Sequence, residues 1–293
     1  MIFRSILSVA LAFGIFGCVP APKPDLHYVL GKPYQAGSVW YYPRDSYDLD
    51  ETGLAGVTRN DSPRLTADGE VFDQTSVAGG HPTLQLPAIV RLTNLDNGRE
   101  ISVRLNDRGS GDPHRLLEIT RRTAELLAVP PNSVVRVRLR VLANESHAAA
   151  DALPGAPSLA MTAVPRGAVE VAELAPPPGV RQGNGHAMTV AAGASRVEMP
   201  MVASPLRLPE TVTQTAPHPG HLMVRLDTFE AYQYASVQRA KMGSEGARIT
   251  PLVEGRTHLF RVEIGPLPDI ARADAVLDRA LASGIPDARI VVD

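Results

Sequence analysis

A long stretch without aromatic residues constrains how this chain of 293 residues can fold. From residue 143 to 217 there is no Phe, Tyr or Trp, and ten prolines interrupt the segment. Such a composition cannot bury enough apolar surface to offset the cost of ordering the backbone. The sequence therefore predicts two domains, at residues 28–142 and 221–293, joined by a Pro/Ala/Gly-rich linker over residues 143–220.

The N-terminal end is typical of a secretory signal. Arg4 precedes an uncharged apolar run from Ile6 to Gly17, which is too short to span a bilayer comfortably. We therefore expect a signal peptide over residues 1–17.

Cys18 follows the signal directly and is the only cysteine of the chain, so it has no internal disulfide partner. Its surroundings resemble a bacterial lipobox, with Ile15 and Gly17 in the expected places, and Val19 resembles the residue of lipoproteins sorted to the outer membrane. We expect lipidation at Cys18 and a tether over residues 18–27, which would hold the protein to a membrane. The alternative is a cleaved signal whose end happens to include a cysteine.

Charge and composition narrow the class of ligand. A formal net charge of -2 at pH 7 argues against nucleic acid as a partner. Histidine and cysteine are scarce and not clustered, so the sequence predicts neither a metal site nor a cofactor.

The N-terminal domain is predicted to be mostly β-strand. Apolar, β-branched or alternating segments occur at residues 38–42, 88–95, 100–106 and 133–142. Asp96-Asn97-Gly98 is a strong hairpin turn between two of them. One helix fits the segment "TRRTAELLAV", with Thr120 as its cap and Pro130 as its stop. Several short strands with one helix predict a small closed barrel.

The C-terminal domain is predicted to contain both strands and helices, in a different order from the N-terminal domain. The expected elements follow the order β-α-β-β-α-β, which is that of a ferredoxin-like domain. They are strands at residues 221–229, 247–253, 258–267 and 288–292, and helices at residues 231–246 and 270–284.

The stretch "ISVRLNDRGSG" contains the first candidate functional residue. Asp107 stands where the alternation of a strand stops, before Arg108-Gly109 turns the chain. From spacing alone, a turn-forming aspartate is the favoured interpretation. The other is a carboxylate held at the rim of a cleft to transfer a proton.

Three motifs decide between these interpretations. In order and spacing, "LTADGEVFD", "GGHPTLQLPAIVRLTNLDNGREISVRLNDRG" and "RLLEITRRTAELLAV" resemble the rare lipoprotein A family. That resemblance implies a double-psi β-barrel in a septal-ring lipoprotein, and lytic transglycosylase activity as in several members. The C-terminal order, with "LFRVEIGPL", is similar to a SPOR domain, which implies binding to peptidoglycan strands that lack stem peptides. Proteins of the division machinery are further partners that the resemblance implies.

The resemblance also implies three site residues. Asp107 would be the acid that protonates the leaving oxygen and later acts as base. Glu70 would assist it by like charge, and His81 would position the sugar or a water. Without the resemblance, Glu70 is an ordinary residue after a turn and His81 a loop residue. Glu118, between Leu117 and Ile119, is predicted to be structural.

Departures from the family pattern leave three functions open. The chain reads "GLAGVTRNDSPRLTADGE" where the family has an aromatic pair and a His-Gly turn, so a glycan contact is lost. The first hypothesis is a lytic transglycosylase on the periplasmic face of the outer membrane, at the division septum. The second is a non-catalytic protein that binds peptidoglycan through the same two domains. The third is a hydrolase that uses Glu70 and Asp107 with water as the acceptor.

Overall fold

Six strands of the N-terminal domain close into a barrel in the computed structural model, which describes residues 22–151, 153–157 and 207–293. The hydrogen-bonded order is β4-β7-β3-β8-β5-β6, and β4 also pairs with β6 and so closes the ring. The closed barrel predicted from the sequence is confirmed. The strands are β3 (Asp50–Val57), β4 (Ala78–Gly80), β5 (Ala88–Asn94), β6 (Arg99–Asp107), β7 (Leu117–Ile119) and β8 (Val134–Val141).

The expected signal peptide at residues 1–17, the lipidation site at Cys18 and the middle of the expected linker lie outside the described residues. Among the residues that the structure does describe, no helix has the length and apolar character needed to cross a membrane.

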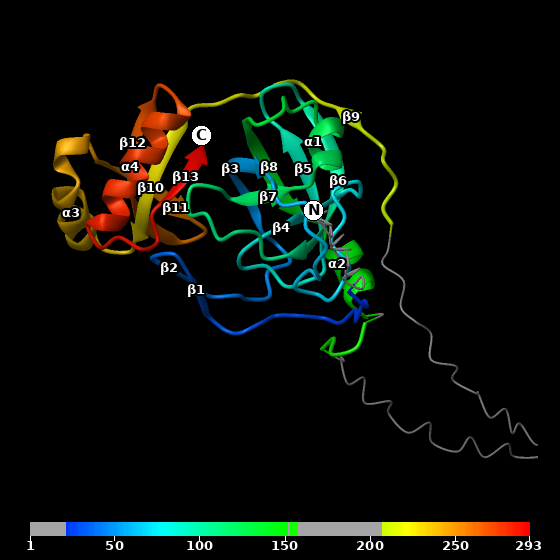
Figure 1. Ribbon diagram of the computed structural model, residues 1–293. Coiled ribbons are helices and arrows are strands. Elements are labelled where there is room, and N and C mark those ends of the chain that lie inside the picture. The colour runs from blue at the N-terminus through cyan, green and yellow to red at the C-terminus, as the bar shows by residue number, and fades with distance from the viewer. Residues whose placement is uncertain (1–21, 152, 158–206) are drawn as a thin grey trace, which may run out of the picture.

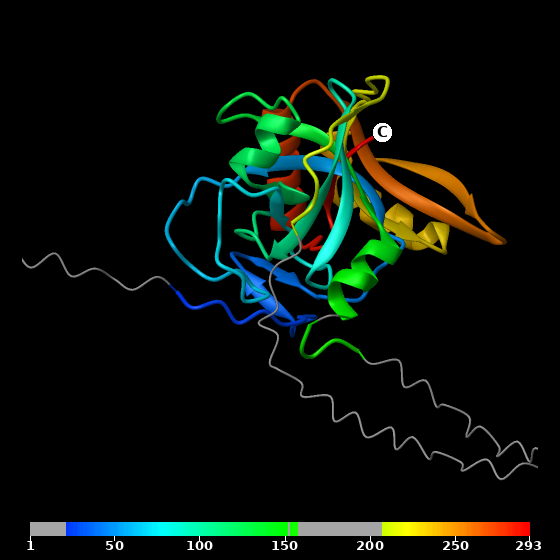
Figure 2. The ribbon, with the colours of Figure 1, turned by 90° about the vertical axis from the view of Figure 1, so that its right-hand side faces the viewer.

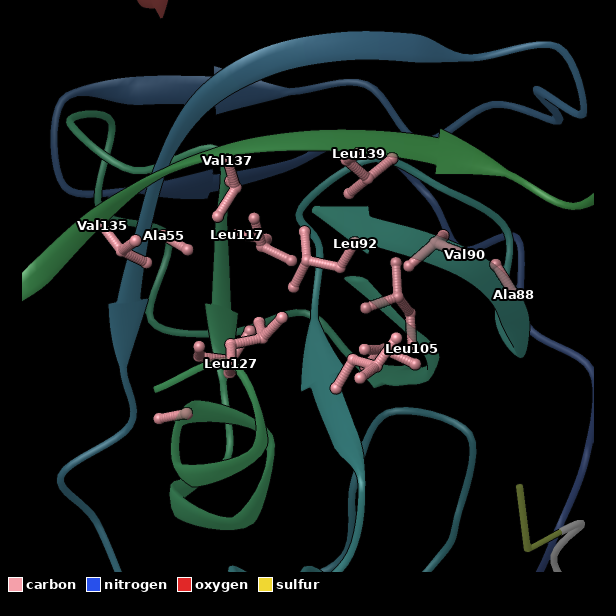
Figure 3. Close-up of a cluster of buried hydrophobic side chains, with 14 of the residues drawn as sticks. Ala55, Ala88, Val90, Leu92, Leu105, Leu117, Leu127, Val135, Val137 and Leu139 are labelled. Carbon is pink, nitrogen blue, oxygen red and sulfur yellow. The ribbon is translucent and has the colours of Figure 1, made fainter. Parts of the chain in front are cut away.

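Alternating side chains build the barrel core. In β8, Val135, Val137 and Leu139 are buried, while the arginines between them point outward. Figure 3 shows these side chains in one cluster with Leu92 and Leu105 from β5 and β6. Burial of this apolar face is the main term that stabilises the barrel.

The strongest local signals of the sequence are confirmed. β5 and β6 form the antiparallel hairpin expected at Asp96-Asn97-Gly98. Helix α1 (Arg121–Leu126) begins after Thr120, whose hydroxyl oxygen accepts a hydrogen bond from the Thr123 backbone N–H at 3.3 Å.

Three barrel strands carry no clear sequence signal. β4 and β7 are three residues each, too short for a periodic pattern. β3 includes two glycines, which normally weaken a strand. A Cβ on Gly53 would lie 2.8 Å from Cβ of Leu116, so close packing requires glycine there.

The range 143–220, predicted to be a linker, is structured at both ends. Helix α2 (Ala143–Asp151) covers the outer face of β5, and the buried Ser146 hydroxyl accepts a hydrogen bond from the Ile89 N–H at 2.9 Å. Strand β9 (Thr213–Gln214) pairs with the start of β6. The absence of aromatic residues and the Ala, Pro and Gly content predict a linker from residue 143, but alanine is the best helix former and suits a close helix–sheet contact.

The C-terminal domain has the predicted β-α-β-β-α-β order. Its sheet runs β11-β12-β10-β13, with every neighbouring pair antiparallel. In α4 the buried residues recur at helical spacing from Ala273 to Ala280, and Asp269 caps the helix through the Arg272 N–H at 2.7 Å. The elements are β10 (Leu222–Phe229), α3 (Tyr232–Lys241), the short 3-10 helix Gly243–Glu245, β11 (Arg248–Glu254), β12 (Thr257–Leu267), α4 (Ile270–Ala282) and β13 (Arg289–Val292).

The two domains are in direct contact. Figures 1 and 2 show β13 on the side of the C-terminal domain that contacts β3 of the barrel, and residues 207–220 run over the barrel to reach β10. Leu54 of β3 is fully buried in the core of the C-terminal domain. The Arg115 guanidinium makes two hydrogen bonds, of 2.9 and 3.1 Å, to the Asp274 carboxylate. A hairpin of β1 (Tyr34–Ala36) and β2 (Val39–Tyr41) lies near this junction.

Closure of the barrel predicts a specific sensitivity at Gly79. A Cβ there would lie 2.7 Å from the Glu118 carbonyl oxygen, in the backbone that β4 must pair with. Gly79→Ala should lower the free energy of unfolding by about 1–3 kcal/mol, measured by urea denaturation. Gly243→Ala is the matched control, because nothing lies within 4 Å of its added Cβ. Equal stability of the two variants would contradict this account of closure.

Candidate active site

The carboxylate of Asp107 lies at the end of β6, at the surface of the barrel. One oxygen, Oδ1, accepts hydrogen bonds from the backbone N–H groups of Ala67 at 3.2 Å and Arg108 at 2.9 Å. The other, Oδ2, makes an ion pair with the Arg64 guanidinium at 2.7 Å. The Asp107 side chain keeps 14% exposure, so it is held rigidly yet remains accessible.

Glu118 lies across a glycine from Asp107. Gly80 of β4 is the register partner of Asp107 in β6 and of Glu118 in β7, so the two carboxylates flank it on neighbouring strands. Strands on either side of a central one are about 10 Å apart, and paired residues project to the same face. A Cβ on Gly80 would lie 2.6 Å from the Gly109 backbone nitrogen, so glycine lets the turn after Asp107 pack against β4 and leaves only a small space between the carboxylates.

A small hollow occupies this space. We call it the Asp107 hollow. Its lining includes Thr58, Phe72, Gly80, Asp107, Gly109 and Glu118. The Glu118 carboxylate accepts hydrogen bonds from the hydroxyls of Ser110 and Thr58, the latter at 3.4 Å. The prediction that Glu118 is merely structural overlooked one signal: between the inward Leu117 and Ile119, a strand residue must face outward.

Glu70 does not face the Asp107 hollow. It is 6% exposed, and its oxygens accept hydrogen bonds of 2.7 Å from Arg104 Nε and from Asn106 Nδ2. Arg104 alternates with Val103 and Leu105, which belong to the barrel core, so Arg104 and the bound Glu70 lie on the outer face of β6, buried beneath residues 66–70. Glu70 is not among the residues that line the Asp107 hollow, so the expected Glu70–Asp107 pair does not share that hollow.

Asp68 shares this buried cluster, although the sequence did not single it out. Its Oδ2 lies 3.5 Å from Arg104 Nη2 and has no hydrogen-bond partner among the described residues, while Oδ1 accepts a hydrogen bond from the Thr66 hydroxyl at 2.7 Å. Burial, and then the negative charge of Glu70, raise the pKa of Asp68 to about 7. Near neutral pH the carboxyl therefore carries a proton part of the time.

His81 is buried and fixed by its own turn. Its Nδ1 accepts hydrogen bonds from the backbone N–H groups of Thr83 and Leu84, both at 3.2 Å, so the proton resides on Nε2. Burial, reinforced by the charges of Arg108 and Arg44, lowers the pKa of His81 to about 3. Only its backbone reaches the site, through a 2.9 Å hydrogen bond from its N–H to the Asp107 carbonyl oxygen.

Arg64 adds a cation to the site that the sequence analysis did not identify. It belongs to the segment that departs from the family pattern, and its guanidinium lies 4.2 Å from the ring centroid of Phe72. As for metals, no group of three His, Cys, Asp or Glu side chains suited to hold an ion occurs in the described part of the chain.

Comparison with known proteins finds a matching family and several relatives. Residues 35–139 match the family model described as lytic transglycolase. The endolytic peptidoglycan transglycosylase RlpA of Salmonella typhimurium is 31% identical over 210 residues, which cover 71% of this chain and 52% of that protein. The protein of the same name from Escherichia coli K12 is 34% identical over 173 residues, covering 58% of this chain and 45% of its own length. The chain spans about half the length of these relatives.

Two solved structures are similar to the C-terminal part. They are the SPOR domain of RlpA from Pseudomonas aeruginosa and the peptidoglycan binding domain of the Bacillus subtilis cell wall lytic enzyme CwlC. Their identities are 19% and 21%, they cover 25% and 28% of this chain and 99% of each of those chains, and their TM-scores are 0.24 and 0.22. At these scores the likeness adds nothing to the topology described above.

The fold and the carboxylates around Gly80 define a double-psi β-barrel of the lytic transglycolase class. The chain belongs to the rare lipoprotein A family.

The raised pKa of Asp68 predicts a pH-dependent stability. The folded value of about 7 lies above the ordinary value of 3.8, so the folded chain keeps a proton that the unfolded chain releases in this window. This contribution to the free energy of unfolding therefore falls as pH rises from about 4 to 7. The Asp68→Asn variant has no carboxyl group to titrate at this position. The free energy of unfolding of this variant should therefore rise relative to that of the wild type by about 4 kcal/mol between pH 4 and pH 8.

The free energy of unfolding of both proteins is measured by urea denaturation across this pH range, and the wild-type value is subtracted from that of Asp68→Asn at each pH. Other titrating groups such as His81 contribute to both values, so their contributions cancel in the difference. Asp48→Asn serves as a control for replacing an exposed aspartate. A wild-type-to-Asp68→Asn difference that stays constant with pH would contradict the assignment.

Proposed function

We propose that the protein is a lytic transglycosylase that cleaves the glycan strands of peptidoglycan in the Asp107 hollow. One observation carries the proposal: two carboxylates flank Gly80 and face the same surface hollow. The names of the relatives, endolytic peptidoglycan transglycosylases, support the substrate class.

Asp107 acts first as acid and then as base. It donates its proton to the glycosidic oxygen as the bond from that oxygen to the anomeric carbon breaks. The resulting carboxylate then removes the proton from the 6-hydroxyl of the muramic acid as this oxygen attacks the anomeric carbon. The product ends in a 1,6-anhydro ring, no water is consumed, and Asp107 regains its proton.

Glu118 and Arg64 complete the site in this proposal. The negative charge of Glu118 stabilises the oxocarbenium-like transition state from across the hollow. Arg64 forms an ion pair with Asp107 in the free protein, and an entering strand displaces Arg64 so that Asp107 is free to donate its proton. Glu70 is a positioning residue, since Arg104 and Asn106 occupy both of its oxygens.

The wider biological setting is also part of the proposal. We expect the C-terminal domain to guide the enzyme to strands that lack stem peptides, at the division septum. Lipidation at Cys18, which would place the protein on the periplasmic face of the outer membrane, and contacts with division proteins stay predictions from the sequence.

A specific observation favours a second function. Arg64 forms an ion pair with Asp107, the proposed acid, and this chain lacks the aromatic pair that the family has in the same segment. A protein in which Arg64 never leaves Asp107 would bind peptidoglycan without cleaving it. The hydrolase that pairs Glu70 with Asp107 is less favoured, because Arg104 and Asn106 occupy both Glu70 oxygens and Glu70 does not line the Asp107 hollow.

Product analysis tests the proposal directly. The full chain is incubated with peptidoglycan stripped of stem peptides, and soluble fragments are identified by mass spectrometry. We expect fragments ending in 1,6-anhydro sugar, and Asp107→Asn should reduce their rate of release at least about 100-fold because the proton donor is lost.

Glu254→Gln is the matched control, since it removes an exposed carboxylate far from the barrel site. Fragments with reducing ends would indicate a hydrolase instead. Binding of the wall material without any released fragment would favour the non-catalytic function.

A further inference from the structure

A larger cleft lies where the barrel meets the C-terminal domain. We call it the junction cleft; its volume is about 260 Å³. One wall is formed by Trp40 to Tyr42 and the loop from His81 to Leu84, and the opposite wall by residues 286–290 at the start of β13. In Figure 1 the β1–β2 hairpin lies on the side of the barrel that faces the C-terminal domain. Neither domain forms this cleft alone.

Two exposed aromatic rings rim the cleft. Trp40 in β2 is 53% exposed, and Tyr42, which directly follows β2, is 64% exposed; both line the cleft. Aromatic faces of this kind stack on sugar rings, whose C–H groups form apolar patches. Trp40 and Tyr42 therefore supply, from another segment, the kind of aromatic contact that this chain lacks in "GLAGVTRNDSPRLTADGE", where the family has an aromatic pair.

The hairpin that presents these rings is anchored. The Tyr41 hydroxyl donates to the Gly111 carbonyl at 3.1 Å, and the Tyr34 hydroxyl donates to the Pro82 carbonyl at 3.1 Å. Their rings stack with centroids 5.4 Å apart. Trp40 and Tyr42 are therefore held in place by their neighbours before any ligand arrives.

Polar side chains around the rings suit a hydroxylated ligand. Glu51 from the barrel and Arg289 from the C-terminal domain form an ion pair at 3.3 Å on the cleft wall. Arg44 and Asp287 also line the cleft and are exposed. Carboxylates and guanidinium groups beside an aromatic face can accept from and donate to sugar hydroxyls.

The junction cleft and the Asp107 hollow lie on one side of the barrel and are linked by shared wall residues. A small intermediate hollow shares Pro82 and Arg115 with the junction cleft. It shares Gly80, Gly109 and Glu118 with the Asp107 hollow. A linear polymer bound at Asp107 can therefore extend along this side of the barrel toward the C-terminal domain.

We infer that the junction cleft is a second glycan subsite, which binds sugar units of the same strand away from the bond that is cleaved. This inference rests on the proposed function. The docked C-terminal domain thus contributes Arg289 and Asp287 to a continuous binding surface, in addition to any surface it uses alone.

Trp40 is the only tryptophan of the chain, so its fluorescence reports on this cleft alone. The probe is soluble glycan strands from which an amidase has removed the stem peptides. They are titrated into the full chain carrying Asp107→Asn, which prevents turnover. We expect a saturable change in Trp40 emission and protection from acrylamide quenching.

Two variants test whether the change in Trp40 emission comes from binding in the junction cleft. Tyr42→Ala in the same background should weaken the apparent affinity about fivefold, through loss of one stacking face. Tyr234→Ala is the matched control, because this tyrosine is 60% exposed on α3, outside the cleft. It should leave the titration unchanged.

Each outcome separates the inference from the proposed function. If the wild type releases 1,6-anhydro fragments while Trp40 emission stays constant during strand binding, the inference is wrong and the function holds. If the emission changes but no fragment forms, the subsite holds and the lyase activity fails. Emission that is already shielded from acrylamide in the free chain and insensitive to strands would mean that the cleft is not accessible to glycan, which also overturns the inference.

Discussion

The buried Arg104 cluster is the interaction on which the site depends. Arg104 is 4% exposed and contacts Glu70 and Asp68 on the face of β6 opposite the barrel core, while Asn106 binds the same glutamate. A buried ion pair contributes little net stability, because desolvation of both partners offsets their attraction. Loss of one partner alone costs about 3–5 kcal/mol, so the arrangement fixes position more than it stabilises. It ties the loop at residues 66–70 to β6 just before Asp107.

The carboxylates near the site form two groups that differ in burial and partners. Glu70 and Asp68 are buried and hold the backbone through Arg104, whereas Asp107 and Glu118 lie beside Gly80 and line the Asp107 hollow. Sequence motifs grouped Glu70, His81 and Asp107 as a set, but they could not show which of them line the same hollow. The place of Asp107 at the end of a strand was predictable from the alternation that leads up to it, while its role was implied only by the family resemblance. The position of Glu118 depends on β7, a strand of three residues that becomes recognisable only by its pairing with β4.

Long, strongly patterned elements were predictable, and contacts between distant segments were not. The alternation of β8, the Asp96-Asn97-Gly98 turn and the Thr120 cap are local, and each is found where the sequence places it. Composition suggested two domains separated by a long linker. It could not reveal that Leu54 of the barrel is buried in the C-terminal core, because an isolated leucine among glycines has no local signature. That contact creates the junction between the domains.

The central claim is that the buried Glu70 positions β6 through Arg104 and Asn106, while Asp107 performs the proton transfer. The most direct measurement compares Glu70→Gln with Asp107→Asn for both unfolding free energy and rate of glycan cleavage. We expect Glu70→Gln to lose about 3 kcal/mol of stability, as for a broken buried ion pair, and to retain turnover in its folded fraction. Asp107→Asn should keep its stability within about 1 kcal/mol, as for a partly exposed pair, and lose turnover. A Glu70→Gln protein of wild-type stability without any turnover would contradict the account.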